Sequence, residues 1–277
     1  GDCGEWEKSH NPHMRGNPIA GIGGLLLLSA TLSTAATSPV TSMSRSGNQI
    51  LGLTVNGASI SQNRFQTGTL TAFAGQTSSV VLAPDDTSLA NGAAAQGYLS
   101  DFLFDSGLIN PAIGANSITL TFSPALVNRP GPDLVVLEIN GSSPADAFQA
   151  KINGITVQVA GTQFGSTGFS TSSSDVLVTR NVGNTADIVV TSLSQLQAAP
   201  LALSSSNNIS QVVYGVALDL SDFGVAEGGS VTTVEMGSSA TGSNFDPVFV
   251  AGIVPATEIT SGVIISEFLT DNGEGIE

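Results

Sequence analysis

Apolar and polar residues alternate with a period of two along much of the chain, which is the pattern of β-strands with one buried and one solvated face. In residues 117–122, for example, Ile118, Leu120 and Phe122 are separated by threonines. Short β-type segments, several of which alternate in this way, are residues 49–55, 67–74, 79–83, 117–122, 133–139, 147–152, 155–160, 175–179, 187–191, 211–220, 230–236 and 247–254. Short strands that follow one another this closely are typical of a β-sandwich or jelly roll.

The strongest strand signal lies in residues 129–141. A Pro-Gly-Pro turn leads into a run of Leu, Val and Ile, with Asp133 in front of the run and Glu138 inside it, and an Asn-Gly pair ends it. Asn-Gly pairs adopt the positive φ angles that tight hairpins need, and further pairs occur at residues 56–57 and 153–154. We predict that residues 129–141 contain the central buried strand of the sandwich.

Four stretches depart from the alternating pattern. Residues 38–47 are rich in Ser, Thr and Gly and are interpreted as a linker. Residues 85–116 are long and weakly patterned, as in an Ω-type or functional loop, and residues 163–174 have the composition of a mobile hairpin tip. Residues 192–199 form the one modest helix candidate, which Pro200 would end.

Composition supports the all-β interpretation and excludes one class of partner. Lys and Arg total 7 against 22 Asp and Glu, which gives a formal net charge of -15. Because Lys, Glu and Arg normally cover exposed helices, long surface helices are not expected. The basic residues are too few and too scattered to follow a phosphate backbone, so nucleic acid is excluded as a partner. An acidic, Lys-poor surface favours a secreted protein in a saline or calcium-containing medium.

The N-terminal region has the layout of a secretory signal peptide. Residues 14–36 begin with Met-Arg, continue with the apolar run 19–28, and end in small residues suited to cleavage near Ala35 or Ala36. The alternative is a buried helix, but three glycines in the run would weaken it. The run is shorter than the roughly 20 apolar residues of a membrane span. We therefore predict membrane contact only during export, and we interpret residues 1–13 as lying upstream of the native start.

This interpretation limits the available chemistry. Cys3, Trp6, His10 and His13 are the only Cys, Trp and His residues, and all precede residue 14. A mature chain without them has no Ser-His-Asp triad, no cysteine nucleophile and no disulfide, and it lacks the usual ligands of structural zinc. Carboxylates are then the strongest functional groups that remain.

Five carboxylates near strand ends are candidate metal ligands. They are Asp133, Glu138, Asp219, Asp222 and Asp246. Asp133 and Glu138 are separated by an odd number of positions and point to opposite faces of a strand, so they cannot bind one ion from that strand alone. Calcium accepts carboxylate, carbonyl and amide oxygens of this kind. The alternative is that these residues simply form turns, since no spaced motif such as an EF-hand loop is present.

Three motifs stand out, namely Gly-Pro-Asp-Leu-Val-Val-Leu-Glu at 131–138, Val-Ala-Leu-Asp-Leu-Ser-Asp-Phe-Gly-Val-Ala at 216–226, and Asp-Pro-Val-Phe-Val-Ala-Gly at 246–252. They resemble exported bacterial surface proteins of the planctomycete and PEP-CTERM type, which carry a galactose-binding-like or jelly-roll β-sandwich. The resemblance implies a non-catalytic role at the cell surface. Residues 262–277, Gly-Val-Ile-Ile-Ser-Glu-Phe-Leu-Thr-Asp-Asn-Gly-Glu-Gly-Ile-Glu, resemble the first strand of a lamin-tail domain, which implies a fragment of a longer protein.

Together these observations predict a signal peptide, a linker at 37–47, a β-sandwich domain at 48–255, a second linker at 256–261 and a truncated lamin-tail-like segment. The expected function is a non-catalytic, secreted or cell-surface module for adhesion, surface structure or ligand binding, with calcium as a candidate stabilising ion. Its expected partner is an extracellular polymer, either carbohydrate or protein. The alternative is a carboxylate-dependent glycoside hydrolase, although such an enzyme would have only Phe and two Tyr side chains on which to stack a sugar.

Overall fold

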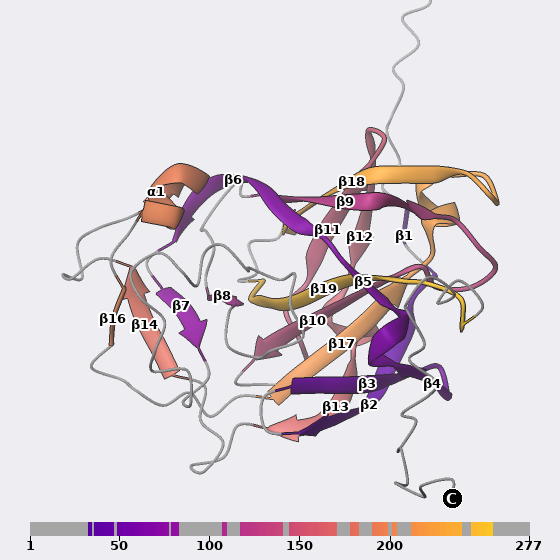
Figure 1. Cartoon of the computed structure of the whole chain (residues 1–277), viewed down its shortest axis with the longest axis horizontal. Helices are drawn as coiled ribbons and strands as arrows, with labels where there is room; N and C mark the ends of the chain where they lie inside the picture. The colour runs from indigo at the N-terminus through magenta and orange to yellow at the C-terminus, as the bar shows by residue number, and fades with distance from the viewer. Residues whose placement is uncertain are drawn as a thin grey trace, which may run out of the picture. The chain divides into compact units, whose positions relative to one another are not determined.

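The computed structural model describes residues 33–34, 36–46, 49–77, 79–82, 107–109, 117–140, 144–170, 178–182, 190–198, 201–203, 212–239 and 245–256. All of them belong to one unit, residues 32–277. The predicted all-β fold is confirmed, because nearly all described elements are strands arranged in sheets that form a sandwich or a nearly closed barrel (Figure 1).

Two large sheets make up most of the described unit. Sheet A contains, in spatial order, β1 (Ser33–Thr34), β12 (Ile155–Val159), β11 (Phe148–Ile152), β18 (Ser230–Ser238), β9 (Ser117–Val127), β6 (Thr69–Thr77) and β15 (Val190–Ser192). Sheet B contains β4 (Ala58–Ser61), β3 (Gln49–Val55), β2 (Ser38–Ser46), β17 (Val212–Leu218), β10 (Leu134–Asn140), β19 (Pro247–Ile253) and β5 (Phe65–Thr67), and β13 (Gly165–Ser170) also pairs with β17.

Strand β10 is the central strand of sheet B, as the sequence predicts. It pairs antiparallel with β17 on one side and β19 on the other (Figure 1), and its first six residues are fully buried. Side chains at even positions, such as Leu134 and Val136, pack in the core between sheets A and B. Side chains at odd positions, such as Val135 and Leu137, pack in a second core on the opposite face. This double burial explains why the segment reads as a continuous apolar run.

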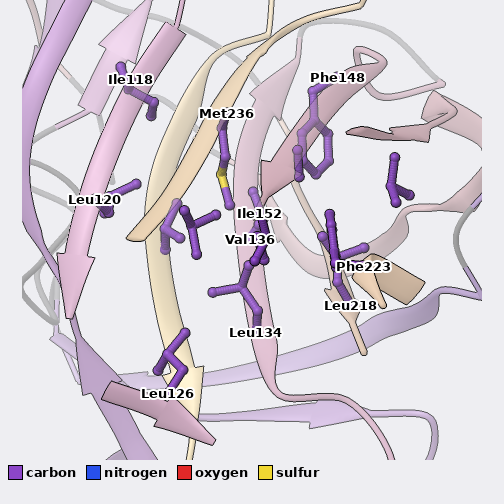
Figure 2. Close-up of a cluster of buried hydrophobic side chains, with 14 of the residues drawn as sticks. Ile118, Leu120, Leu126, Leu134, Val136, Phe148, Ile152, Leu218, Phe223 and Met236 are labelled. Carbon is purple, nitrogen blue, oxygen red and sulfur yellow. The ribbon is translucent and has the colours of Figure 1, made fainter. Parts of the chain in front are cut away.

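The first core lies between the two sheets. Figure 2 shows Ile118 and Leu120 of β9 and Met236 of β18 facing Leu134 and Val136 of β10. The second core is formed by strands of sheet B alone, because the sheet curls so that β2, β3, β4 and β5 cover the other face of β10. Each core removes a large apolar surface from water, which is the main favourable contribution to folding.

A close approach between strands requires glycine in β17. A Cβ atom at Gly215 would lie 2.6 Å from Leu137 Cδ2 and 2.7 Å from Val40 Cβ. Glycine therefore lets β2 and β10 pack tightly against β17. This contact attaches β2 to the central strands of sheet B.

The remaining described elements form a small sheet and short helices. Sheet C contains β16 (Leu201–Leu203), β14 (Val178–Val182), β7 (Ser79–Leu82) and β8 (Gly107–Ile109). Helix α1 spans Leu193–Ala198, which confirms the helix predicted at 192–199. Three 3-10 helices are η1 (Gln62–Arg64), η3 (Gly161–Gln163) and η4 (Leu220–Phe223).

Two of the predicted hairpins are present. Asn56 and Gly57 join β3 to β4, and Asn153 and Gly154 join β11 to β12, with positive φ angles at all four residues. Asn140 ends β10, whereas Gly141 lies outside the described residues.

Two predictions from composition are wrong. The linker interpretation of residues 37–47 is corrected by strand β2, which pairs with β3 along its length and with β17 at Ser38 and Pro39. Within the hairpin tip predicted at 163–174, residues 165–170 instead form β13, where the buried Thr167 donates its hydroxyl hydrogen to the Val213 carbonyl at 2.8 Å, and residues 171–174 lie outside the described residues. Both segments are rich in Ser, Thr and Gly, and they form strands because neighbouring strands satisfy their backbone groups.

Other predictions fall partly or wholly outside the described residues. These are residues 1–13, most of the signal peptide, most of the loop at 85–116, and residues 257–277 with the lamin-tail-like segment. Within the predicted signal peptide, Ser33 and Thr34 form β1, which pairs in parallel with β12. Strand β2 begins at Ser38, so cleavage near Ala35 or Ala36 would remove β1 and leave β2 intact.

Candidate functional site

Three of the predicted acidic residues lie near the start of β10. Asp133 immediately precedes the strand, and Asp219 and Asp222 lie at the end of β17 and in η4. Burial is the main cause that raises the pKa of both Asp133 and Asp222, and the negative charge of the nearby Asp219 adds to the rise in each. The structure therefore brings these three carboxyl groups together at one end of sheet B.

Asp133 ties this end of the sheet together through four hydrogen bonds. Its Oδ1 accepts from the Arg129 backbone N–H at 3.0 Å, and its Oδ2 accepts from the Leu220 backbone N–H at 3.1 Å. Its own N–H donates to Leu218, and its carbonyl accepts from Ile253. Burial raises the pKa of Asp133 to about 6, and the two amide donors oppose that rise. Asp133 thus joins the turn before β10 to β17, η4 and β19.

Asp219 and Asp222 also bind backbone amides. Asp219 is the N-cap of η4 and accepts from the Ser221 N–H at 2.8 Å. Asp222 accepts from the Ala36 N–H at 3.0 Å, and its pKa is raised mainly by burial. The Asp219 bond is the turn-forming role that the sequence offers as the alternative to metal binding, whereas the Asp222 bond connects η4 to the residues just before β2.

Glu138 lies at the other end of β10, together with Asp246 and with Asp146, which sequence reasoning missed. Its side chain is 0% exposed. Its Oε1 accepts from the Asp146 backbone N–H at 2.8 Å, whereas its Oε2 has no hydrogen-bond partner among the described residues. Asp246 is 6% exposed and directly precedes Pro247, the residue that pairs with Glu138 across the sheet.

The surroundings of Glu138 favour its neutral form. Its pKa is raised to about 9, mainly by burial and in addition by the carboxylates of Asp146 and Asp246, whereas the Asp146 N–H that donates to Oε1 opposes the rise. Because this pKa lies well above 7, Glu138 is a protonated carboxylic acid at neutral pH. The sequence predicts that Asp133 and Glu138 cannot bind one ion together. The structure places them in two separate groups of acidic residues, in agreement with that prediction.

A small cavity is lined in part by Pro247, the residue that pairs with Glu138 across the sheet. Phe245, which precedes Asp246, stacks on Phe148 with ring centroids 4.6 Å apart. The cavity is lined by Phe245, Pro247 and Ser238 among others and has a volume of about 10 Å³, and Glu138 is not part of its lining. That is room for about one water molecule. Ser238 Oγ is also buried without a partner among the described residues, so such a water has a polar group to bind.

The acidic residues do not assemble into an obvious metal site. Within the part of the chain that the structure describes, no three Asp, Glu, His or Cys side chains are placed so that they could hold one ion. A cation near Glu138 would therefore take at most two carboxylates from the described residues and would need other oxygens, such as backbone or water oxygens, to complete the six to eight ligands of calcium.

A larger groove lies between the sheets, close to Asp133. It has a volume of about 400 Å³ and is bordered by β5, by the second half of β9 and by the end of β19. Its lining consists of Phe65, Gln66, Pro124, Ala125, Leu126, Val127, Arg129, Asp133, Ile253 and Val254. The volume is within the range of about 300–1,000 Å³ that is usual for small-molecule sites.

An irregularity in β9 shapes this groove. Leu126 pairs with Val231 of β18, and Thr121 pairs with Thr233, so residues 122–125 of β9 lie opposite a single residue of β18. The extra residues bulge out of the sheet and form one wall. Leu126 reaches across to sheet B, where a Cβ atom at Gly252 would lie 2.1 Å from Leu126 Cδ2. Glycine at this position therefore lets the two sheets meet at the groove.

A second hollow, of about 330 Å³, lies over β2, β3 and β4. Its described lining is mainly Ser, Thr, Leu and Gly and contains no charged residue. No described helix is long and apolar enough to cross a membrane.

Comparison with known proteins gives no match: no protein-family model, no curated protein and no solved structure matches this chain. The resemblances to surface proteins and to a lamin-tail domain therefore remain predictions from the sequence.

Proposed function

We propose that this protein is a non-catalytic, exported β-sandwich module that binds a ligand or contributes to structure at the cell surface. The observation that carries the proposal is the role of its acids. Asp133, Asp219, Asp222 and Glu138 each accept a hydrogen bond from a backbone N–H. Carboxylates that are occupied in this way support loops and strand ends, which is a structural role.

The alternative, a carboxylate-dependent glycoside hydrolase, has less support. Such an enzyme needs two carboxyl groups about 5–9.5 Å apart that both face a bound sugar. Glu138 and Asp246 act on each other electrostatically, but both are buried, and neither lines any of the three hollows described above. Asp133 borders the larger groove, where it is 2% exposed and both its oxygens accept backbone N–H groups.

Calcium belongs to the proposal as a stabilising ion. Glu138 is the position at which a bound cation would be most stabilising. Its Oε2 lacks a hydrogen-bond partner among the described residues, and the neighbouring Asp146 and Asp246 are also acidic. A bound ion would deprotonate Glu138, whereas a retained proton satisfies the same need without metal. The two possibilities give opposite results for the Glu138→Gln variant described in the Discussion.

Two assays on the full chain test the proposal. The first measures retention of the protein on an insoluble bacterial cell-envelope fraction, and the second measures the release of reducing ends from cellulose, xylan and pectin suspensions. We expect retention on the envelope, and no release above that of heat-denatured protein. Sugar release that is abolished in both Glu138→Gln and Asp246→Asn would overturn the proposal in favour of the enzyme.

A further inference from the structure

The backbone nitrogen of Ala36 lies against a carboxylate. Its N–H donates to Asp222 Oδ2 at 3.0 Å, and Ala36 itself is exposed. Asp222 is half-buried in η4, and Asp219, the N-cap of the same helix, places a second negative charge nearby. Burial raises the pKa of Asp222, the Ala36 N–H opposes that rise, and the charge of Asp219 adds to it. A cation at the position of this nitrogen would therefore be attracted by two carboxylates.

Ala36 also lies at the end of the predicted signal peptide. The small residues Ser33 and Ala35 stand three positions and one position before Ala36, as in the A-x-A pattern of cleavage sites. Cleavage of the next bond is the alternative that the sequence leaves open, and it would make Thr37 the first residue. The contact with Asp222 favours cleavage before Ala36, because only that cleavage turns the Ala36 nitrogen into a chain terminus.

We propose that the exported protein begins at Ala36 and that its new α-ammonium group forms an ion pair with Asp222. The inference rests on the export part of the proposed function and adds a processing site to it. A signal peptidase of the exporting cell would hydrolyse the peptide bond before Ala36, so that water supplies the hydroxyl of the new carboxylic acid and a hydrogen to the new amine. The acid then releases its proton and the amine takes one up, because an α-amino group has a pKa of about 8.

The position of Ala36 is fixed by the residues that follow it. Thr37 Oγ1 accepts a hydrogen bond from Gln163 Nε2 at 3.1 Å. Strand β2 then begins at Ser38, pairs with β17, and buries Val40 completely. None of these contacts involves a residue before Ala36. Cleavage therefore removes β1 and its two-residue pairing with β12, and it leaves the Ala36 nitrogen facing Asp222.

The position of Asp222 is fixed as well. Two of the four residues of η4, Leu220 and Phe223, are fully buried. Asp219 caps the helix, and the Leu220 N–H donates to Asp133 Oδ2 at 3.1 Å. Surface ion pairs are usually weak because two long side chains must be ordered to form them. A chain terminus held by β2 and an aspartate held by η4 avoid most of that loss.

The charges around this nitrogen favour a cation. Asp222 and Asp219 are the charged residues of η4 and its cap, whereas η3 and β12, two other described elements near this part of the chain, contain no charged side chain. An α-ammonium group has three N–H donors where the amide has one, so it keeps its bond to Asp222 and also donates to water. The charged donor makes a stronger hydrogen bond to the carboxylate than the neutral amide does.

The first test is the N-terminus of the exported protein. The chain is expressed with export in a bacterial host from Met14, the predicted native start, and the product recovered outside the cytoplasm is analysed by mass spectrometry of the intact protein and of its N-terminal peptide. We expect the product to begin at Ala36. A product that begins at Thr37 or elsewhere, or that keeps residues 14–35, would overturn the inference.

The second test measures the reactivity of the α-amino group in that product. Acetic anhydride at pH 7 modifies only the deprotonated amine, so an ion pair slows the reaction. We expect the wild-type α-amine to react about two- to fivefold more slowly than that of an Asp222→Asn variant, as for a partly exposed ion pair. Glu235→Gln is the matched control, since the Glu235 carboxylate pairs with Lys151, and it should react like wild type. Equal rates in wild type and a folded Asp222→Asn variant would contradict the ion pair.

A third measurement needs no substitution. The unprocessed full chain has an amide at Ala36, whereas the processed product has an ammonium group there. NMR titration of the Asp222 carboxyl carbon should therefore give a lower pKa in the processed product than in the unprocessed chain, because a neighbouring cation favours the carboxylate. An equal or higher pKa in the processed product would overturn the ion pair.

The envelope-retention assay distinguishes failure of this inference from failure of the proposed function. If the exported protein is retained on the envelope and begins at a residue other than Ala36, the processing site fails and the surface role stands. If the product begins at Ala36 with a slowly reacting α-amine and the envelope fraction does not retain it, the ion pair stands and the surface role fails.

Discussion

Glu138→Gln is the most informative single substitution, because Gln has the shape of the protonated Glu side chain and cannot ionise. In the folded protein the pKa of Glu138 rises from 4.5 to about 9, mainly through burial. Below pH 4.5 the residue is protonated in both the folded and the unfolded state, so its burial does not make the free energy of unfolding depend on pH. Between pH 4.5 and about 9 only the unfolded state releases the proton, so the folded state loses about 1.4 kcal/mol of stability for each pH unit.

This slope sets the size of the effect. The accumulated loss for wild-type protein is about 3 kcal/mol at pH 7 and about 6 kcal/mol at pH 9, above which it stays constant. The Gln variant does not carry this loss, because its amide oxygen can still accept from the Asp146 N–H and its side chain stays neutral. We therefore expect the variant to be about 3 kcal/mol more stable than wild type at pH 7 and equally stable at pH 4.

The assay is denaturant unfolding of both proteins, followed by far-ultraviolet circular dichroism, at intervals from pH 4 to pH 10. Glu235→Gln is the control, since Glu235 is 39% exposed and forms a surface ion pair with Lys151 at 3.2 Å. Its removal should change stability by less than about 1 kcal/mol. The reasoning is refuted if wild type and Glu138→Gln have parallel pH dependences. A variant several kcal/mol less stable than wild type at pH 7 would instead show that Glu138 is ionised and bound to a cation.

Three further predictions follow from the packing and the calcium hypothesis. Gly215→Ala places a methyl group against Leu137 and Val40 and should cost about 1–3 kcal/mol in denaturant unfolding, whereas an unchanged midpoint would show that the strands separate easily. Asp133→Ala leaves two backbone N–H groups without an acceptor and should cost at least about 2 kcal/mol, and a smaller loss would mean that water replaces the carboxylate. If calcium stabilises the fold, excess EDTA should lower the melting temperature, since free calcium at 100 times its Kd contributes about 2.7 kcal/mol, and an unchanged melting temperature removes calcium from the proposal.

The sequence predicted the strands well where burial is regular. The pattern of alternating residues found β9 and the continuous apolar run found β10, because one or both faces of these strands are buried. It missed β2, in which only Val40 is fully buried among the described side chains and Ser and Thr dominate. The burial of such a polar strand depends on its pairing with β3 and on contacts around Gly215, which no local pattern records.

The types of residue at the candidate site could be predicted from the sequence, but the way in which the fold groups these residues could not. Period-two geometry separates Asp133 from Glu138, and the structure places them in different acidic groups. No sequence pattern pointed to Asp146, because its contact with Glu138 depends on the course of the chain between β10 and β11. The groove at Arg129 also escaped prediction, since it depends on the bulge in β9 and on the meeting of Leu126 with Gly252 across two sheets.

The central claim is that the acids of the β10 region are buried structural groups. Its most direct test is an NMR titration of the side-chain carboxyl carbons of Asp and Glu in the full chain. We predict that Glu138 titrates with a pKa near 9 and Asp133 with a pKa near 6. Titration of both Glu138 and Asp133 near their ordinary values of 4.5 and 3.8 would show that these carboxylates are solvated, and would contradict the claim.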